Sequence, residues 1–512
     1  MITWTILQAN KMNTPIPVID LFAGPGGLGE GFSSFKKNGR RAFQLKLSIE
    51  KDKLAYQTLL LRSIFRSFKS SAPQAYYDYI TGKISKAEFH GNKKIAERLN
   101  EAMNEAKNVT LGDTDEKEVD KWIKSSIGKS DKWALIGGPP CQAYSTIGRV
   151  KMMNSDLEKY KKDSRHLLYK EYLRIIEVHR PPVFIMENVK GILSSQLNGE
   201  LIFNKIISDL SSPKKGLHYE IRSLCIDTDS EDLLPKDFII ESEKYGIPQS
   251  RHRVILFGVR KDLANKKHSI LKIEKELVTV REVLAPLPRI RSKLSRQADL
   301  HESWVENLEK TNSMIGSWRS DSKDKIISSI RRNQNLAKDL FSTGSSFIED
   351  GLNQHLENPL SSWLEDSKIG GVIQHESKSH MNEDIQRYFF LSNCAKILGR
   401  SPKLTELPKK LMPNHQNASV KGTIFLDRFR VQIFDQPSTT IVSHIAKDGH
   451  YYIHPDPSQA RSFTVREAAR LQTFPDNYFF EGPKTAQYTQ VGNAVPPLLA
   501  RKIAEIVYQF LN

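Results

Sequence analysis

Cysteine is scarce in this sequence, which has only Cys141, Cys225 and Cys394 among its 512 residues. An odd number at such wide spacing argues against a disulfide framework and against the paired spacing of a zinc site. We therefore expect a protein of a reducing compartment, the cytoplasm, that holds no metal.

Long apolar runs are also missing, and no stretch approaches the length needed to cross a membrane. The first 22 residues contain no basic flank that leads into a long apolar core. We therefore expect neither a signal peptide nor a membrane partner.

Acidic residues are outnumbered, because 59 Asp and Glu face 76 Lys and Arg, which gives a net charge of +17. A basic excess favours polyanionic partners such as nucleic acid, although many basic proteins bind no polyanion. Hydrophobic residues make up 39% and charged residues 26% of the chain, a globular composition with room for about two to four domains.

Short buried strands and helices alternate over the first half of the chain. Strands are predicted at 15–22, 43–50, 109–113, 133–140, 183–189, 219–226 and 253–259. Helices are predicted between the later strands, at 167–179 and 201–210. This alternation predicts an α/β fold with a Rossmann-like, doubly wound and mainly parallel sheet. A helical insertion at about 53–107 interrupts the pattern, and we interpret it as a solvated excursion.

The pattern changes at two points and so divides the chain into three parts. Residues 1–262 form the predicted α/β domain, and residues 263–428, irregular and rich in charge and Ser, form a smaller mixed domain. Residues 429–512 return to the first domain. They contain a helix capped by Thr464 and a final amphipathic helix at 496–511.

Glycines crowd the turn after the first strand, at 24, 26, 27, 29 and 31. A strand that runs into such a turn lets a cofactor approach the backbone closely, although a purely structural turn is an equally common cause. Glu50 ends the second strand, where an acidic group would meet ribose hydroxyls. Asp113 ends the third and could accept a hydrogen bond from an adenine amine.

Cys141 differs from the other two cysteines because Gly137, Gly138, Pro139 and Pro140 fix a tight loop before it. This loop presents the thiol at the carboxyl edge of the sheet, where ligands bind. Cys225 and Cys394 lie in apolar segments, and we interpret them as inert.

Polar groups also follow two later strands. Glu187 ends the strand at 183–189, and a buried carboxyl is costly unless it has a partner or a task. It could be a helix cap or an ion pair, or it could contact a heterocycle near the thiol. Arg251 and Arg253 would share one face of a strand and could bind a carbonyl oxygen and a phosphate, or they could be ordinary surface arginines.

Six segments together resemble the bacterial cytosine-C5 DNA methyltransferase family. In the family's order they are DLFAGPGGLGEGF, GGPPCQAYS, ENVKG, YGIPQSRHRV, REAARLQTFPDNY and QVGNAVPPLLA. The resemblance covers about residues 15–260 and 428–510, and it omits 262–430 and the insertion. It implies a Rossmann-like catalytic domain and a smaller target-recognition domain that face each other across a DNA cleft.

The resemblance also implies roles for single residues. Cys141 would be the nucleophile, Glu187 would contact cytosine N3, Arg253 would contact O2, and Arg251 would orient the same pocket. Residues 142–165 match a loop that closes over DNA. The S-adenosylmethionine site would comprise Asp20, Phe22, Ala23, Gly24, Gly26, Gly27, Glu50, Asp113, Pro140, Asn493 and Val495.

The implied activity is methyl transfer from S-adenosylmethionine to carbon 5 of a flipped cytosine in a specific duplex sequence, through a covalent Cys141 adduct. The partner would be double-stranded DNA, bound by a monomer in the bacterial cytoplasm. A restriction–modification role, with a separately encoded endonuclease, is the family's usual context. A tRNA methyltransferase, a silent DNA-binding relative and a fused nuclease are alternatives. The large second region argues against a tRNA methyltransferase. The full set of signature residues argues against a silent relative, and the lack of a nuclease cluster argues against a fused nuclease.

Overall fold

The computed structural model describes residues 14–68, 71–140, 165–197, 200–228, 232–316, 318–352, 360–413 and 428–512. Cys141 and residues 142–164 of the predicted closing loop lie outside the described residues. No helix within these ranges is long and apolar enough to cross a membrane.

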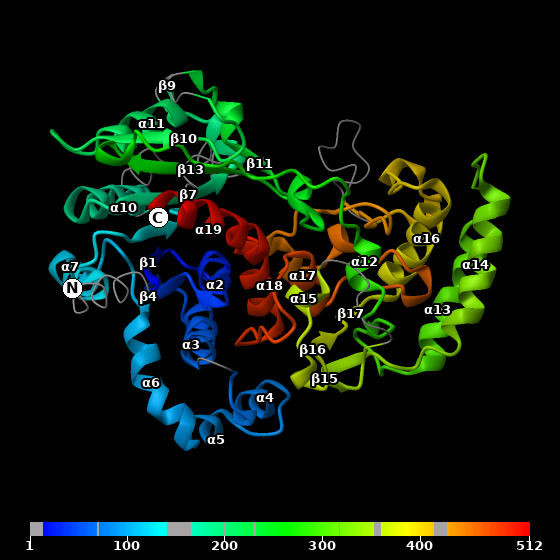
Figure 1. Ribbon diagram of the computed structural model, residues 1–512. Helices are drawn as coiled ribbons and strands as arrows, with labels where there is room; N and C mark the ends of the chain where they lie inside the picture. The colour runs from blue at the N-terminus through cyan, green and yellow to red at the C-terminus, as the bar shows by residue number, and fades with distance from the viewer. Residues whose placement is uncertain are drawn as a thin grey trace.

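An eight-stranded sheet forms the centre of the first domain (Figure 1). Seven strands follow the order β10-β13-β7-β6-β1-β4-β5, and β11 pairs with β13. Their bounds are β1 Ile16–Leu21, β4 Phe43–Glu50, β5 Ala106–Asn108, β6 Ala134–Gly137, β7 Val183–Val189, β10 Tyr219–Arg222, β11 Ile239–Glu241 and β13 His252–Arg260. The strands from β5 to β7 are parallel and β13 is antiparallel to its neighbours, so the predicted mainly parallel sheet is confirmed.

The strand predicted at 109–113 is wrong, because β5 ends at Asn108. Two local features turn the chain after that point. Gly112 has a φ of 89°, and the Thr114 hydroxyl donates to the Thr110 carbonyl at 2.9 Å. Such a turn cannot continue an extended ladder.

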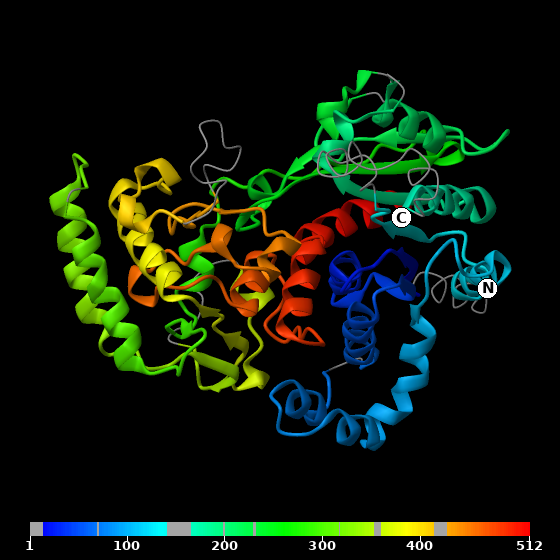
Figure 2. The ribbon, with the colours of Figure 1, turned by 180° about the vertical axis from the view of Figure 1, so that it is seen from behind.

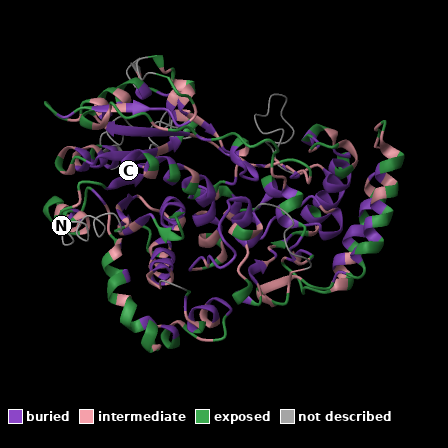
Figure 3. Ribbon diagram, viewed as in Figure 1, coloured by how far each residue is buried: buried purple, intermediate pink, exposed green. Residues whose placement is uncertain are grey.

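Strand side chains alternate between two cores, one on each face of the sheet. Val18, Leu45 and Ile136 pack with helices α2 (Gly27–Ser34) and α19 (Pro497–Leu511). Ile19, Leu47 and Leu135 pack on the other face with α7 (Glu116–Ile127), α10 (Arg165–His179) and α11 (Ile202–Ser211). Figure 3 shows the strands buried between these helices.

The insertion at 53–107 is helical as predicted, and its last two helices are mostly exposed, but its first two helices are packed into a core. It forms α3 (Lys53–Ser67), α4 (Gln74–Ile80), α5 (Lys86–Gly91) and α6 (Lys93–Glu105). Arg62 is 3% exposed and Tyr76 is fully buried. Its apolar side chains share a core with Ile369 and Ile373 of the second region, beside the hairpin of β15 (Gly344–Glu349) and β16 (Gly371–Glu376) (Figures 1 and 2).

The second region has a core of its own, built by α13 (His301–Met314), α14 (Lys323–Ala337) and α16 (Asn382–Leu398) around Trp304 and Phe389. Phe429 and Ile453 complete this core from beyond residue 428. In the other direction Val280 of α12 (Val280–Leu284) packs in the α2–α19 core. Shorter elements of the chain include α15 Ser361–Leu364, β2 Lys36–Lys37, β3 Arg40–Arg41, β8 Gln196–Leu197, β9 Glu200–Leu201, β12 Gln249–Ser250, β14 Lys293–Leu294, β17 Ser379–His380 and β18 Ser438–Thr439.

The C-terminal part returns to the sheet through three helices, α17 (Val465–Leu471), α18 (Lys484–Asn493) and α19. Thr464 caps α17 as predicted, because its hydroxyl accepts from the Glu467 amide at 3.2 Å. The Glu467 carboxylate in turn accepts from the Thr464 amide at 2.7 Å and completes a capping box.

Candidate active site

A cavity of about 1070 Å³ opens at the carboxyl ends of the parallel strands. The chain leaves β1 toward β4 on one side, and β6 lies on the other side, so the cavity occupies the point where strand order reverses. Of the predicted site residues, Phe22, Gly24, Glu50, Pro140, Glu187 and Asn493 line it. Residues Asp20, Ala23, Gly26, Gly27, Asp113, Arg251, Arg253 and Val495 are not in its lining.

The loop after β1 reaches the cavity through a run of left-handed conformations. Phe22 has a φ of 57°, Gly24 of 58° and Gly26 of 99°. A non-glycine residue with positive φ is strained, so surrounding contacts must hold Phe22 in place. A Cβ on Gly24 would have nothing within 4 Å, so the backbone at this position faces open space.

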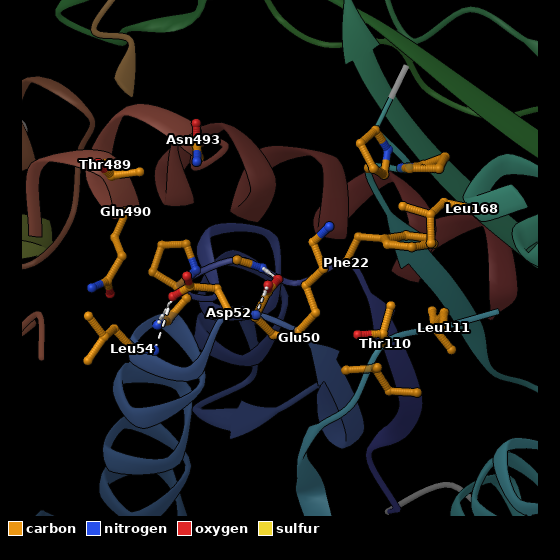
Figure 4. Close-up of a pocket in the computed structure, with 18 of the residues that line it drawn as sticks. Phe22, Glu50, Asp52, Leu54, Thr110, Leu111, Leu168, Thr489, Gln490 and Asn493 are labelled. Atoms are coloured by element: carbon orange, nitrogen blue, oxygen red, sulfur yellow. Dashed lines mark hydrogen bonds between the residues drawn. The ribbon is translucent and has the colours of Figure 1, made fainter. Parts of the chain in front are cut away.

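Glu50 fastens this loop to the end of β4. Its carboxylate accepts hydrogen bonds from the Gly24 amide at 2.8 Å and from the Asp52 amide at 2.7 Å (Figure 4). Burial raises the pKa of Glu50, although these two amides partly offset it. Asp52 caps α3, so one turn joins the loop, the strand end and the helix.

Gly27 and Val495 shape the cavity from behind. A Cβ on Gly27 would lie 2.2 Å from the Val495 carbonyl oxygen, so only glycine permits this approach. The Ala23 amide donates to the Ile49 carbonyl at 3.0 Å and continues the β1–β4 pairing into the loop. These residues support the wall without reaching its surface.

Asp20 lies beneath the loop, on β1, and is fully buried. Neither of its oxygens has a hydrogen-bond partner among the described residues. Burial raises the pKa of Asp20 to about 8, and Arg66 only partly offsets this effect. The carboxyl is therefore mostly protonated at neutral pH.

Asp113 is exposed in the turn after β5, and Val109, Thr110 and Leu111 line the cavity in its place. The turn that ends β5 early therefore leaves Asp113 outside the lining of the cavity, and its contact with an adenine amine stays a prediction.

Glu187 stands at the other end of the cavity. Its carboxylate is paired with Arg253 at 3.0 Å, and both side chains are 14% exposed. The neighbouring Asn188 amide donates to the Pro139 carbonyl at 3.2 Å, which holds the Gly-Pro-Pro loop against β7. Pro140 precedes Cys141 in the sequence and lines the same cavity.

Arg251 does not share a strand with Arg253, because β12 ends at Ser250 and β13 begins at His252. Its guanidinium is buried and donates to the carbonyls of Ile441 at 2.9 Å and Gly492 at 3.3 Å. Burial, helped by Arg253, lowers the pKa of Arg251 to about 9. Arg251 thus fastens the returning C-terminal part beside the site.

One wall comes from α18, of which sequence reasoning predicted only Asn493. Thr485, Thr489 and Asn493 recur every four residues, and Gln490 lies beside them, so one face of the helix lines the cavity. Figure 4 shows Thr489, Gln490 and Asn493 across the cavity from Phe22 and Glu50. The spacing was present in the sequence, but it carried no chemical signature. Gln490 also accepts from the Thr58 hydroxyl at 2.6 Å and ties α18 to α3.

The two described cysteines lie in surroundings that disfavour the thiolate. Burial raises the pKa of both Cys225 and Cys394. A thiol with a raised pKa forms little thiolate at neutral pH.

Comparison with known proteins gives consistent matches. Residues 86–509 match the family described as C-5 cytosine-specific DNA methylase. The type II methyltransferase M.Bpa9945I of Bacillus paralicheniformis is 32% identical, over 97% of this chain and 99% of its own. The type II methyltransferase M.AgeI of Thalassovita gelatinovora is 28% identical, over 96% of this chain and 98% of its own length. An E. coli prophage-encoded protein described as a DNA modification methyltransferase shares the fold, with a TM-score of 0.55, 21% identity and coverage of 97% and 99%.

Proposed function

Because the chain belongs to the C-5 cytosine-specific DNA methylase family, we propose that it transfers the methyl group of S-adenosylmethionine to carbon 5 of a flipped cytosine in duplex DNA. One observation carries this proposal. A single cavity extends from the glycine loop and Glu50 to Glu187 and Pro140, so a donor and a base could meet inside it.

The first end of the cavity fits S-adenosylmethionine. Glu50 offers an acceptor for ribose hydroxyls, and Gly24 leaves the backbone open to close approach. Phe22 and Asn493 would hold the ligand from two sides, while Gly27 and Val495 keep the wall in shape. Asp113, in the turn that follows β5, would accept a hydrogen bond from the adenine amine. Bound S-adenosylmethionine supplies a methyl group on a sulfonium, an electrophile that no side chain provides.

The second end fits the activation of cytosine. Carbon 5 is a poor nucleophile until a thiolate adds to carbon 6 and turns the ring into an enamine. We assign this addition to Cys141 by its place in the family motif. Glu187 would hold a proton at ring N3, and Arg253, already paired with Glu187, would contact O2. Arg251 keeps this corner rigid. Carbon 5 would then take the methyl group as its bond to the sulfonium breaks, and a base would remove the carbon 5 proton as the bond from carbon 6 to sulfur breaks and frees the thiol.

DNA recognition is the second part of the proposal. The target atoms are stacked inside a duplex, so the base must be flipped to reach such a cavity. The net charge of +17 would supply phosphate contacts, and the second region would read the sequence. Since relatives are named type II methyltransferases, we propose a restriction–modification role beside a separate endonuclease.

Duplex DNA with 5-fluorocytosine at the target position tests this proposal. After Cys141 adds to carbon 6 and carbon 5 is methylated, no proton remains on carbon 5, and fluorine cannot leave as a cation. The protein should stay joined to the DNA through denaturation, and only when S-adenosylmethionine is present.

The cysteine variants supply the controls. Cys141→Ser should form no adduct, whereas Cys225→Ser and Cys394→Ser should form it like the wild type. An adduct that maps to Cys225 or Cys394, or its absence on a verified target site, would refute the assigned chemistry.

A further inference from the structure

The glycine loop is held from outside by the C-terminal part of the chain. The Tyr478 hydroxyl donates a hydrogen bond to the carbonyl of Pro25, which lines the cavity. A Cβ on Gly26 would lie 3.0 Å from this hydroxyl and 2.8 Å from the Leu59 side chain. The loop is thus enclosed between Tyr478 and α3.

Tyr478 is itself firmly fixed. Its side chain is fully buried, and its carbonyl accepts from the Arg466 guanidinium at 2.8 Å. The Arg62 guanidinium lies 4.8 Å from the centre of its ring. Burial raises the pKa of Tyr478, so the hydroxyl remains protonated and can donate throughout the neutral range.

Arg62 links the segment that contains Tyr478 to α2, the helix that follows the glycine loop. It binds the Glu30 carboxylate of α2 through two nitrogens, at 3.0 and 2.6 Å, and the Asn477 side chain at 2.9 Å. Burial alone would raise the pKa of Glu30, but Arg62 and Arg66 outweigh it and lower the pKa. Removal of one partner from a charge pair buried this completely is costly, because the other charge is left without a partner.

The anchor extends into the second region. The Asn477 amide donates to the Asp366 carboxylate at 2.6 Å, and the Tyr77 hydroxyl of α4 donates to the same oxygen at 2.9 Å. The loop carbonyl is therefore held by a support that is not part of the sheet.

We propose that Tyr478 is a positioning residue for the glycine loop and acts on the cofactor site through Pro25. The inference rests on the proposed S-adenosylmethionine site. The loop contains left-handed residues at 22, 24 and 26, so a lost external bond would let it relax away from the binding conformation. Tyr478 does not line the cavity, and its effect is therefore indirect.

Tyr478→Phe removes only the hydroxyl and tests the role. Its dissociation constant for S-adenosylmethionine, measured by calorimetry without DNA, should rise by about 3- to 10-fold, the range for one buried hydrogen bond. KM for S-adenosylmethionine should rise in parallel, while kcat at saturation should stay within about twofold because the reacting groups are untouched.

Tyr219→Phe is the matched control. Its buried hydroxyl also donates to a proline carbonyl, that of Pro181 at 2.9 Å, but at the far edge of the sheet on β10. This variant should lose stability to a similar degree and bind S-adenosylmethionine as the wild type does.

The possible outcomes separate the two proposals. Equal binding by wild type and Tyr478→Phe, or equal weakening in Tyr219→Phe, would overturn the positioning role and leave the proposed function standing. If the wild-type chain binds no S-adenosylmethionine, the proposed cofactor is wrong and the positioning role is overturned with it.

Discussion

The buried carboxyl of Asp20 should make the stability of this protein fall as the pH rises. Burial raises its pKa from 3.8 to about 8 in the folded chain. The folded state therefore binds the proton more tightly than the unfolded state does, and the free energy of unfolding decreases with pH across that window. Asp20→Asn removes the titrating group and should lose this dependence.

The size of the effect follows from the same shift. Each pH unit between about 4 and 8 lowers the free energy of unfolding of the wild type by at most about 1.4 kcal/mol. Water that enters the site on ionisation reduces this cost. We therefore expect the difference in the free energy of unfolding, Asp20→Asn minus wild type, to increase by about 2–4 kcal/mol between pH 5 and pH 8. Urea titrations at each pH, followed by far-ultraviolet circular dichroism, measure the difference.

Ser48→Ala is the control for this experiment. Ser48 faces Asp20 in the β1–β4 register, and its hydroxyl also has no partner among the described residues. The alanine variant keeps the carboxyl and should retain the wild-type pH dependence. A constant difference between Asp20→Asn and wild type from pH 5 to 8 would show that Asp20 is not the titrating group.

Two further predictions concern the chemistry and the specificity. Glu187→Gln keeps the shape of the side chain, but the amide cannot transfer a proton and loses the ion pair with Arg253. We therefore expect kcat to fall by about 10²- to 10⁴-fold, while calorimetry shows unchanged binding of S-adenosylmethionine. Near-normal turnover would exclude the proton role. The second variant exchanges residues 288–460 for the matching segment of a relative, because this segment contains the helical core of the second region in one piece. Bisulfite sequencing should then show a different methylated site. An unchanged site would place recognition elsewhere.

Periodicity and motif spacing predicted most strands of the sheet and six of the residues that line the cavity. Strands β4 and β7 matched their predicted ranges for different reasons, because β7 begins with a continuous apolar run and β4 alternates apolar with polar residues. Phe22, Gly24 and Glu50 line one cavity because carboxyl ends of parallel strands meet at one edge. The place of Cys141 stays a prediction.

Other features depend on contacts that no local pattern encodes. The charged insertion was interpreted as solvated, yet Arg62 is buried because Glu30, 32 residues away, neutralises it. Arg251 seemed to share a strand with Arg253, but carbonyls at 441 and 492 hold it at a strand break. In each case a partner distant in sequence determines the burial of a charged group.

The cofactor cavity draws on both ends of the chain. Its floor comes from residues before 60, and its α18 wall comes from residues after 480, with the whole second region between them. Gly27 admits the Val495 carbonyl at a distance that no other residue would allow, and Tyr478 bonds the loop from the same returning part. Contacts of such long range carry a high entropic cost, because the ends of a long intervening chain must be brought together. The first domain alone therefore lacks one wall of the cavity and one anchor of its glycine loop, so the proposed cofactor site would be complete only in a chain whose C-terminal part has returned to the sheet.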